Sequence, residues 1–269
     1  MFIFVFALIT IPVLDFLKLE SHYFLIFLCV MIFALICVYS YKYLIENTRK
    51  TKMQKALGRY LSYDVMKNVV KNIDNISLGG KRTDITVLFA DIRNFTSISE
   101  KMDVKTTTKI LNEYFSALVP VIEENNGILN KFMGDAILAI FGEPKKTSNH
   151  ALDAVRCADK MLKKVKHLQE KWMDEGKPKI EIGIGISSGD AFIGNIGSKE
   201  RFEYTVIGDT VNTASRIENY NKVYKTNFLI SEETYDRVKS NIDVITINNV
   251  SIRGKANKIN LYEVVRLAK

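Results

Sequence analysis

The apolar and polar positions divide the chain into two kinds of sequence. Long apolar runs come first, and short apolar stretches at strand or helix spacing follow from residue 79 onward. Residues 23–41 hold 19 positions without a charge. At about 1.5 Å rise per residue this run spans roughly 28 Å, close to the hydrocarbon core of a bilayer. We predict a transmembrane helix there, in preference to a fully buried core helix.

A second, shorter apolar run lies at 1–14 and contains Pro12. It predicts either another span or the end of a longer sensor region. Five basic residues follow the main run: Lys42, Arg49, Lys50, Lys52 and Lys55. Such a cluster is expected on the cytoplasmic side of an inner membrane. Apolar residues then recur at helical spacing: Met53, Leu57, Leu61, Val65 and Val69. They indicate an amphipathic linker helix that can pair with its copy in a dimer, or a plain solvated connector.

The rest of the chain interleaves strand and helix patterns. We expect strands at 85–92, 127–132, 136–141 and 180–187, and helices at 104–125 and 150–172. This β-α-β-β-α-β order predicts an α+β fold, a ferredoxin-like sandwich. The C-terminal additions are expected to be strands at 191–197, 202–208, 244–253 and 260–266 and a helix at 210–220.

Composition limits the class of partner and the compartment. The net charge of +8 falls entirely after residue 44, because the few charges before it balance. This diffuse basic balance suits anionic membrane lipid or a polyphosphate ligand, and we expect no nucleic acid partner. The three cysteines show neither disulfide nor metal spacing, which favours a reducing compartment.

Two carboxylates stand at the ends of apolar strand patterns. "ITVLFADIRNFTSISE" runs from four apolar residues into Asp91, and burying that acid is costly unless something pairs with its charge. In "LNKFMGDAILAIFG", Gly134 and Asp135 mark a tight turn between two strands. Two such carboxylates suit hard divalent cations, which take their remaining oxygens from water and substrate phosphates. Two metals of this kind can activate an attacking oxygen and neutralise a leaving one.

A third motif, "YTVIGDTVNTASR", places Asn212 and Arg216 four residues apart, on one face of a helix. An amide and a fixed cation suit a ribose and a phosphoryl oxygen, although a capping Asn and a solvated Arg are the ordinary alternative. The glycines of "GIGISSG" fall within a strand pattern rather than at a strand-to-helix turn, so we do not interpret them as a dinucleotide-binding loop.

Three stretches in this order, "TVLFADIRNFTSISE", "LNKFMGDAILAIFGEP" and "FEYTVIGDTVNTASRIE", resemble the class III nucleotide cyclase catalytic domain. The resemblance covers 57–269 and is closest to bacterial membrane-anchored adenylate cyclases. It implies a membrane segment at 1–44, a helical linker at 45–80 and a catalytic domain at 81–269. It also implies two Mg²⁺ or Mn²⁺ ions per active site, bound by Asp91, Asp135 and the backbone carbonyl of Ile92.

The resemblance further implies roles for substrate-binding residues. Asn212 and Arg216 match the pair that orients the ribose and stabilises the transition state. Lys131 and Thr205 match the pair that selects the base. The other substrate contacts are expected at Lys255, on the polyphosphate, and at Phe95 and Thr96. Asn94 stands where the family often has Gly, and Asn tolerates the positive φ that this loop requires.

The base-selecting pair predicts ATP as substrate. Lys131 only donates hydrogen bonds and Thr205 donates or accepts, which fits the acceptor N1 and donor N6 of adenine. Guanine presents donors at N1 and N2 and would require a carboxylate in place of Lys131. Thr205 departs from the Asp of mammalian membrane enzymes, so rejection of GTP is expected to be looser.

The family's active sites lie between two subunits, and this chain holds every residue of both halves. We therefore predict a homodimer with two shared sites, regulated through the angle that the membrane helices impose. Few residues separate the two apolar runs, so sensing is assigned to a region upstream or to a membrane partner. The alternatives are a guanylate cyclase and a catalytically silent, membrane-tethered nucleotide-binding module. A diguanylate cyclase is disfavoured because no GGDEF stretch occurs.

Overall fold

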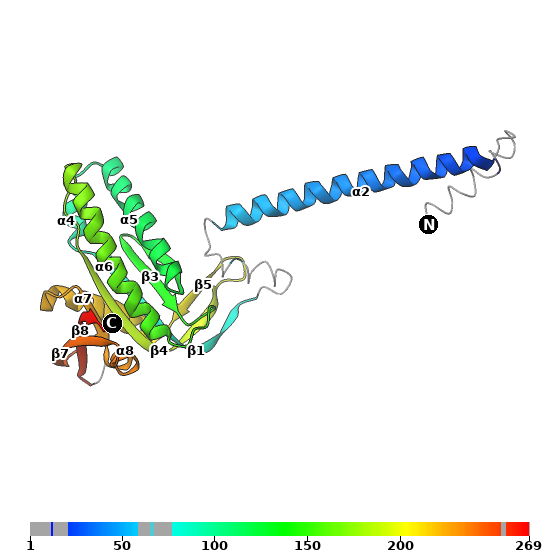
Figure 1. The fold of residues 1–269 in the computed structure, drawn as a ribbon. Helices are drawn as coiled ribbons and strands as arrows, with labels where there is room; N and C mark the ends of the chain where they lie inside the picture. Colours follow the sequence, from blue (N-terminus) through cyan, green and yellow to red (C-terminus); the bar gives the residue numbers. More distant parts are fainter. Residues whose placement is uncertain (1–11, 13–20, 59–65, 67–76, 254–256, 269) are drawn as a thin grey trace. The chain divides into compact units, whose positions relative to one another are not determined.

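A computed structural model describes residues 12, 21–58, 66, 77–253 and 257–268 of the chain (Figure 1). It divides the chain into two compact units, residues 1–60 and 61–269, which are considered separately below. The predicted boundaries of a membrane segment at 1–44 and a linker at 45–80 stay predictions.

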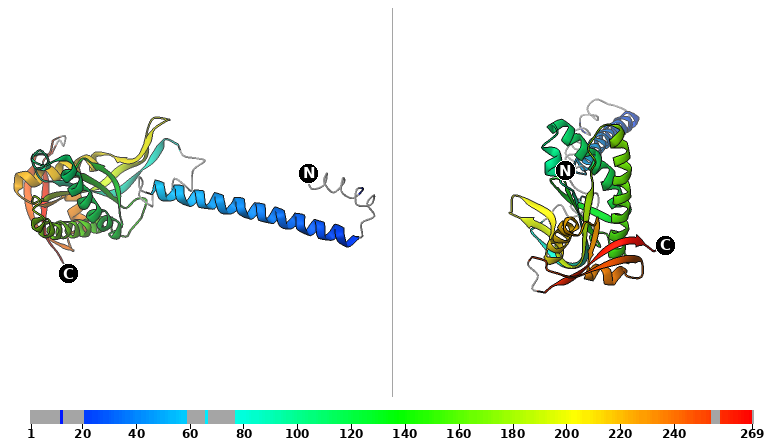
Figure 2. Two further views of the ribbon diagram at one scale, coloured as in Figure 1. Left: turned by 90° about the horizontal axis from the view of Figure 1, so that it is seen from above. Right: turned by 90° about the vertical axis from the view of Figure 1, so that its left-hand side faces the viewer.

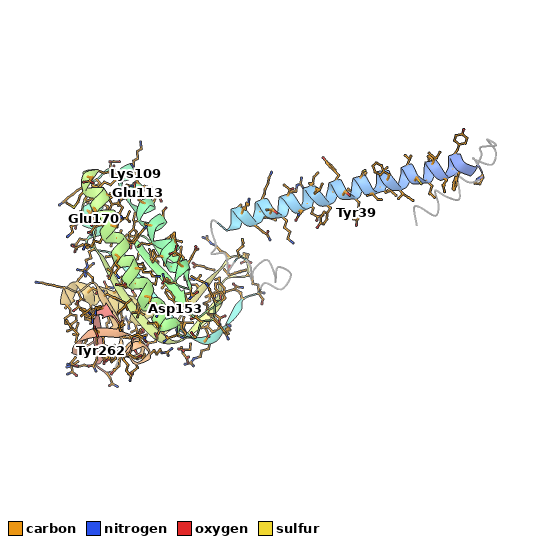
Figure 3. All side chains as sticks on the ribbon, viewed as in Figure 1. Tyr39, Lys109, Glu113, Asp153, Glu170 and Tyr262 are labelled. Carbon is orange, nitrogen blue, oxygen red and sulfur yellow. The ribbon has the colours of Figure 1, made fainter. Side chains whose placement is uncertain are left out.

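One helix, α2 (Ser21–Leu57), forms all but two residues, 12 and 58, of the described part of the first unit. Its segment Tyr23–Ala56 has a mean hydropathy of 2.6 in its most apolar window, and none of that window is buried. Among the described residues it is the one helix long and apolar enough to cross a membrane. Phe33 has 67% of its surface exposed, and Tyr39, which has 80% exposed, projects outward from α2 (Figure 3). Apolar surface of this extent is costly in water, so α2 is not the core helix of a folded unit.

The apolar run 1–14 lies outside the described residues apart from Pro12, and so do Leu61, Val65 and Val69 of the linker pattern. The described part of the linker continues α2 without a break through the basic cluster to Leu57. Met53 is exposed on this part of the helix.

The second unit is built on an antiparallel four-stranded sheet with two covering helices. Its elements are β1 (Gly79–Ile92), α5 (Val104–Glu124), β2 (Gly127–Met133), β3 (Ala136–Phe141), α6 (His150–Asp174) and β4 (Ile182–Gly197). The strands lie in the order β2-β3-β1-β4. This is the predicted β-α-β-β-α-β sandwich, and the α+β fold is confirmed.

The C-terminal additions extend this sheet. They are β5 (Phe202–Ile207), α7 (Asp209–Tyr224), β6 (Phe228–Ser231), α8 (Glu232–Val238), β7 (Ile242–Val250) and β8 (Ile259–Leu267). β5 pairs with the second half of β4, whereas β6 runs parallel to its first half. β8 and β7 then complete the sheet.

Three elements were not predicted from the sequence: β6, α8 and the short helix α4 (Phe95–Ser99). β6 has only four residues, too few to show a strand period, and Ser231 at its end already caps α8 by accepting from the Thr234 N–H at 3.3 Å. The predicted strands 180–187 and 191–197 are one strand, β4, and β1 begins six residues before the predicted 85.

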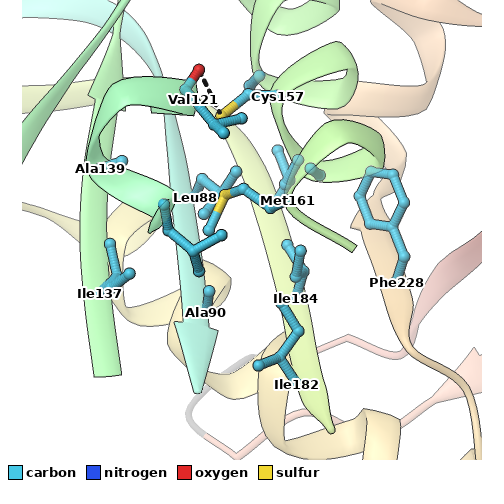
Figure 4. Close-up of a cluster of buried hydrophobic side chains, with 14 of the residues drawn as sticks. Leu88, Ala90, Val121, Ile137, Ala139, Cys157, Met161, Ile182, Ile184 and Phe228 are labelled. Carbon is cyan, nitrogen blue, oxygen red and sulfur yellow. Dashed lines mark hydrogen bonds between the residues drawn. The ribbon is translucent and has the colours of Figure 1, made fainter. Parts of the chain in front are cut away.

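The core lies on both faces of the sheet, because alternate residues of β1 point to opposite sides. Leu88, Ala90 and Ile92 pack beneath α5 and α6, around Met161 (Figure 4). Val87 and Phe89 belong to a second buried cluster that includes Ala214 of α7. Helices therefore cover both faces of the β1–β4 pair (Figure 2). Both faces of β1 are buried just before Asp91, which accounts for the unbroken apolar sequence of the strand there.

Candidate active site

The two predicted metal-binding aspartates lie side by side. Asp91 is the second-last residue of β1, and Asp135 follows Gly134 in the turn between β2 and β3. Gly134 has φ 68°, a left-handed conformation that glycine adopts without steric cost, so the turn is tight enough to place Asp135 beside the neighbouring strand end. Burial, and then the hydrogen bond and charge of Asp135, raise the pKa of Asp91 to about 6.

Burial is the larger cause of this raised pKa, and the part that comes from Asp135 reflects the cost of holding two carboxyl groups together. A divalent cation would remove that cost, and carboxylate oxygens are the ligands that Mg²⁺ and Mn²⁺ prefer. The residues present therefore fit the predicted metal. Ile92, whose backbone carbonyl was the third predicted ligand, is itself buried in the core. Across residues 77–253 and the other described residues, no group of three His, Cys, Asp or Glu side chains is close enough to hold an ion alone.

The loop after β1 leads into α4. Asn94 has φ 54°, so the positive φ expected at this position is confirmed. Thr96 is exposed, whereas the Phe95 side chain packs against the hydrophobic core. The Phe95 side chain is therefore only partly accessible to a ligand in this structure. Lys255, which the resemblance assigns to the substrate polyphosphate, lies outside the described residues.

Helix α7 carries Asn212 and Arg216 on a face that is not packed into the core. The opposite face of α7 is buried: Thr210, Thr213, Ala214, Ile217, Glu218 and Asn221. Asn212 is exposed and Arg216 half-buried, and neither side chain makes a hydrogen bond or ion pair with another described residue. An amide and a guanidinium are thus presented together from one rigid helix.

Glycines of β4 allow α7 to approach the sheet closely. Gly183 lies directly opposite Asp91 in the β1–β4 register. A Cβ on Gly183 would stand 2.5 Å from Oε1 of Glu218, so the Glu218 carboxyl occupies the space of the missing side chain. Residues opposite one another on antiparallel strands have neighbouring side-chain positions, which makes Glu218 a neighbour of Asp91.

Glu218 was missed by the sequence analysis. It is 2% exposed, and burial followed by the charge of Asp91 raises its pKa to about 7. Lys222, one turn further along α7, acts in the opposite direction on this pKa. Burial and the charges of the same acids also raise the pKa of the fully buried Tyr114. The alternating glycines of "GIGIS" signal a close backbone approach, but they do not reveal which helix approaches.

The two predicted base-selecting residues come from adjacent strands. Lys131 on β2 forms an ion pair with Glu203 on β5, with 2.8 Å between Nζ and Oε1. Thr205 on β5 is 8% exposed, and its hydroxyl donates to Oδ1 of Asn130 at 3.2 Å. The polar groups of β2 and β5 therefore form one contact region beside the turn that holds Asp135.

A family model described as "Adenylate and Guanylate cyclase catalytic domain" matches residues 80–265. Adenylate cyclase 1 of Rhizobium meliloti is 30% identical over 226 residues, which are 83% of this chain but 34% of that relative. The chain thus spans about a third of that protein's length.

Two crystal structures are similar to the second unit. The adenylyl cyclase CyaB from P. aeruginosa has a TM-score of 0.66 and 33% identity, over 70% of this chain and 97% of that one. The guanylyl cyclase Cya2 has a TM-score of 0.67 and 34% identity, over 71% of this chain and 96% of that one. The matched family model covers well over half of the chain, including the acid pair, both predicted base-selecting residues and the exposed face of α7. The chain therefore belongs to the adenylate and guanylate cyclase catalytic domain family, the class III nucleotide cyclases.

Proposed function

We propose that this chain is a membrane-anchored adenylate cyclase, a phosphorus–oxygen lyase that converts ATP to 3′,5′-cyclic AMP and pyrophosphate. The observation that carries the proposal is the pair of crowded carboxyl groups, Asp91 and Asp135, at adjacent strand ends of a cyclase domain. Asp91, Asp135 and the Ile92 carbonyl would hold two Mg²⁺ or Mn²⁺ ions. When bound, these ions would lower the pKa of the ribose 3′-hydroxyl and neutralise the phosphates.

In the proposed reaction the 3′-oxygen of the ribose attacks the α-phosphorus, and the bond from the α-phosphorus to the bridging oxygen breaks. The hydroxyl proton passes to water, and pyrophosphate leaves with the bridging oxygen. Asn212 orients the ribose, and Arg216 stabilises the charge that gathers on the phosphoryl oxygens. Lys255 and the loop residues Phe95 and Thr96 contact the polyphosphate. The protein contributes mainly positioning and charge stabilisation.

The substrate proposal is ATP because of the base-selecting pair. Lys131 is a donor that suits adenine N1, and a carboxylate would be needed there for guanine. Its ion pair with the half-exposed Glu203 is solvated and therefore weak, so a bound purine can replace it at little cost. Similarity to both an adenylyl and a guanylyl cyclase structure makes GTP the second nucleotide to test.

We further propose that two copies of the chain share each site. One copy would supply the aspartates, and the other Lys131, Thr205, Asn212 and Arg216. Large apolar side chains are exposed near these residues, as expected of an interface: Phe132, Met133 and Ile207 are 43%, 51% and 51% exposed. α2 would anchor the dimer in membrane lipid of the inner membrane. The basic residues from Lys42 to Lys55 would then place the catalytic domain in the cytoplasm.

The test is cyclic nucleotide production by the full chain in lipid vesicles, with ATP or GTP and with Mg²⁺, Mn²⁺ or EDTA. Asp91→Asn removes a charge from the acid pair and should lower the rate by at least about 100-fold. Asp236→Asn is the matched control, because Asp236 is 63% exposed on α8. EDTA should abolish turnover.

Each outcome has a separate meaning. Cyclic GMP formed faster than cyclic AMP would refute the choice of adenine. An Asp91→Asn variant as active as Asp236→Asn would refute the metal site. No product from either nucleotide would support the silent binding module instead.

A further inference from the structure

Thr205 is hydrogen-bonded to Asn130, a residue outside the predicted base-selecting pair. Its hydroxyl lies 3.2 Å from Oδ1 of Asn130 on β2. The other end of the same amide, Nδ2 of Asn130, lies 3.1 Å from the backbone oxygen of Tyr204. Asn130 therefore connects β2 to two consecutive residues of β5.

These two contacts determine which way the Asn130 amide faces. The Tyr204 carbonyl oxygen can only accept a hydrogen bond, so it must face the NH₂ group of Asn130. Oδ1 then faces Thr205, and because an amide oxygen can only accept, the Thr205 hydroxyl must donate. Thr205 has a single hydroxyl proton. Once that proton is used, only lone pairs remain on its oxygen for a ligand.

A β-bulge brings Asn130 to this position. The β2–β3 register shifts between Leu129 and Lys131, so Asn130 is the unpaired extra residue. In a regular strand, consecutive side chains point to opposite faces of the sheet. Here the consecutive residues Asn130 and Lys131 both contact β5, one at Thr205 and the other at Glu203. A bulge produces this re-aiming of a side chain.

We propose that Asn130 is a specificity-determining positioning residue, which makes the Thr205 hydroxyl an acceptor and so selects a 6-amino purine over a 6-oxo purine. Adenine has a donor amino group at C6, which an acceptor hydroxyl can bind. Guanine has an acceptor oxygen there, which would meet the lone pairs of Thr205. This inference rests on the proposed function, because it takes Lys131 and Thr205 as the residues that contact the base.

The experiment compares adenine and guanine nucleotides in the full chain in lipid vesicles. The probes are 3′-deoxy-ATP and 3′-deoxy-GTP, which lack the attacking hydroxyl and so report binding without turnover. In Asn130→Ala the Thr205 hydroxyl is free to donate to the guanine oxygen. The ratio of the two dissociation constants should move toward guanine by about tenfold. If Asn130→Ala does not fold, Asn130→Leu takes its place. Leucine also lacks the polar atoms of asparagine, and its volume is closer to that of asparagine than alanine's is.

The matched control is Thr205→Val, which removes the hydroxyl whose direction Asn130 sets. In this background Asn130→Ala should change the ratio by less than about twofold, because no hydroxyl proton remains to redirect. An equal shift in both backgrounds would overturn the inference. So would an Asn130→Ala variant that weakens both nucleotides alike, since that is the result of a purely structural role.

The proposed function is judged separately in the same preparation. If the wild-type chain binds the 3′-deoxy nucleotides but makes no cyclic AMP from ATP, the proposed cyclase activity is refuted. The ratio of the two dissociation constants can still be measured in that case. Wild-type chain that binds neither nucleotide would overturn both proposals.

Discussion

Gly185→Ala should displace the helix that carries Asn212 and Arg216. Gly185 lies on β4 directly beneath α7. An added Cβ would overlap the backbone nitrogen of Glu218 and the backbone oxygen of Ala214. The overlap is about 1 Å relative to ordinary van der Waals contact, and both neighbouring atoms belong to a helix backbone that cannot rotate away. α7 as a whole must therefore move away from the sheet.

The expected effects differ in size for stability and for activity. Overpacking of this kind costs about 1–3 kcal/mol in the free energy of unfolding. In the proposed reaction Asn212 and Arg216 must be aligned with the reacting phosphate, and a displacement of about 1 Å there is expected to cost about 100-fold in kcat. The assay is cyclic nucleotide production by the full chain, together with urea unfolding.

Gly176→Ala is the matched control, because it also replaces a glycine at an unfavourable position but introduces no contact with α7. Gly176 has φ 69° and open space around its Cα, so Ala there costs about 1 kcal/mol of backbone strain without any clash. Loss of kcat in Gly185→Ala alone would support the reasoning. Equal kcat in the two variants at similar stability would refute the claim that the position of α7 sets the rate.

Two further predictions concern buried polar groups. Glu218 has its pKa raised from 4.5 to about 7, so the folded chain holds this proton to higher pH than the unfolded chain, and stability falls as the pH rises through that window. Because glutamine does not titrate, Glu218→Gln in EDTA should gain about 2–3 kcal/mol in the free energy of unfolding relative to wild type between pH 5 and pH 8, measured by urea unfolding; identical pH profiles would contradict this. The fully buried Trp172 donates from Nε1 to Oε2 of Glu113 at 2.7 Å, so Trp172→Phe should lower the free energy of unfolding by about 2–3 kcal/mol. Thermal or urea unfolding beside Glu113→Ala in a double-mutant cycle checks it, and a cost below about 0.5 kcal/mol would mean that this hydrogen bond is dispensable.

The sequence predicted the central sheet because its signals are local. The apolar run that ends at Asp91, and the glycine-marked turn before Asp135, each lie within a few residues. The four-residue strand β6 has no such signal, since no period can be read from so short a run. It is recognisable only through its pairing with β4 and β8.

The same distinction holds for the site. Asn212 and Arg216 could be placed on one face because helical spacing alone decides it. Glu218 and Asn130 could not be recognised, because their surroundings depend on long-range contacts. Glu218 lies beside Asp91 only since Gly183 leaves space across the sheet, and Asn130 contacts Thr205 only through a bulge that changes the register of β2.

The unbroken length of α2 couples the apolar part of the chain to its basic part. Between Ser21 and Leu57 the helix contains neither proline nor glycine, and at about 1.5 Å per residue it is roughly 55 Å long. The hydrocarbon core of a bilayer is only about 30 Å thick, so α2 is longer than a membrane span requires. Because the helix is continuous, any rotation of its apolar part about the helix axis rotates its basic part by the same angle. Inserting one residue into α2 would rotate its C-terminal end about the helix axis by about 100° relative to the apolar part. Inserting seven residues would restore the original direction to within about 20°.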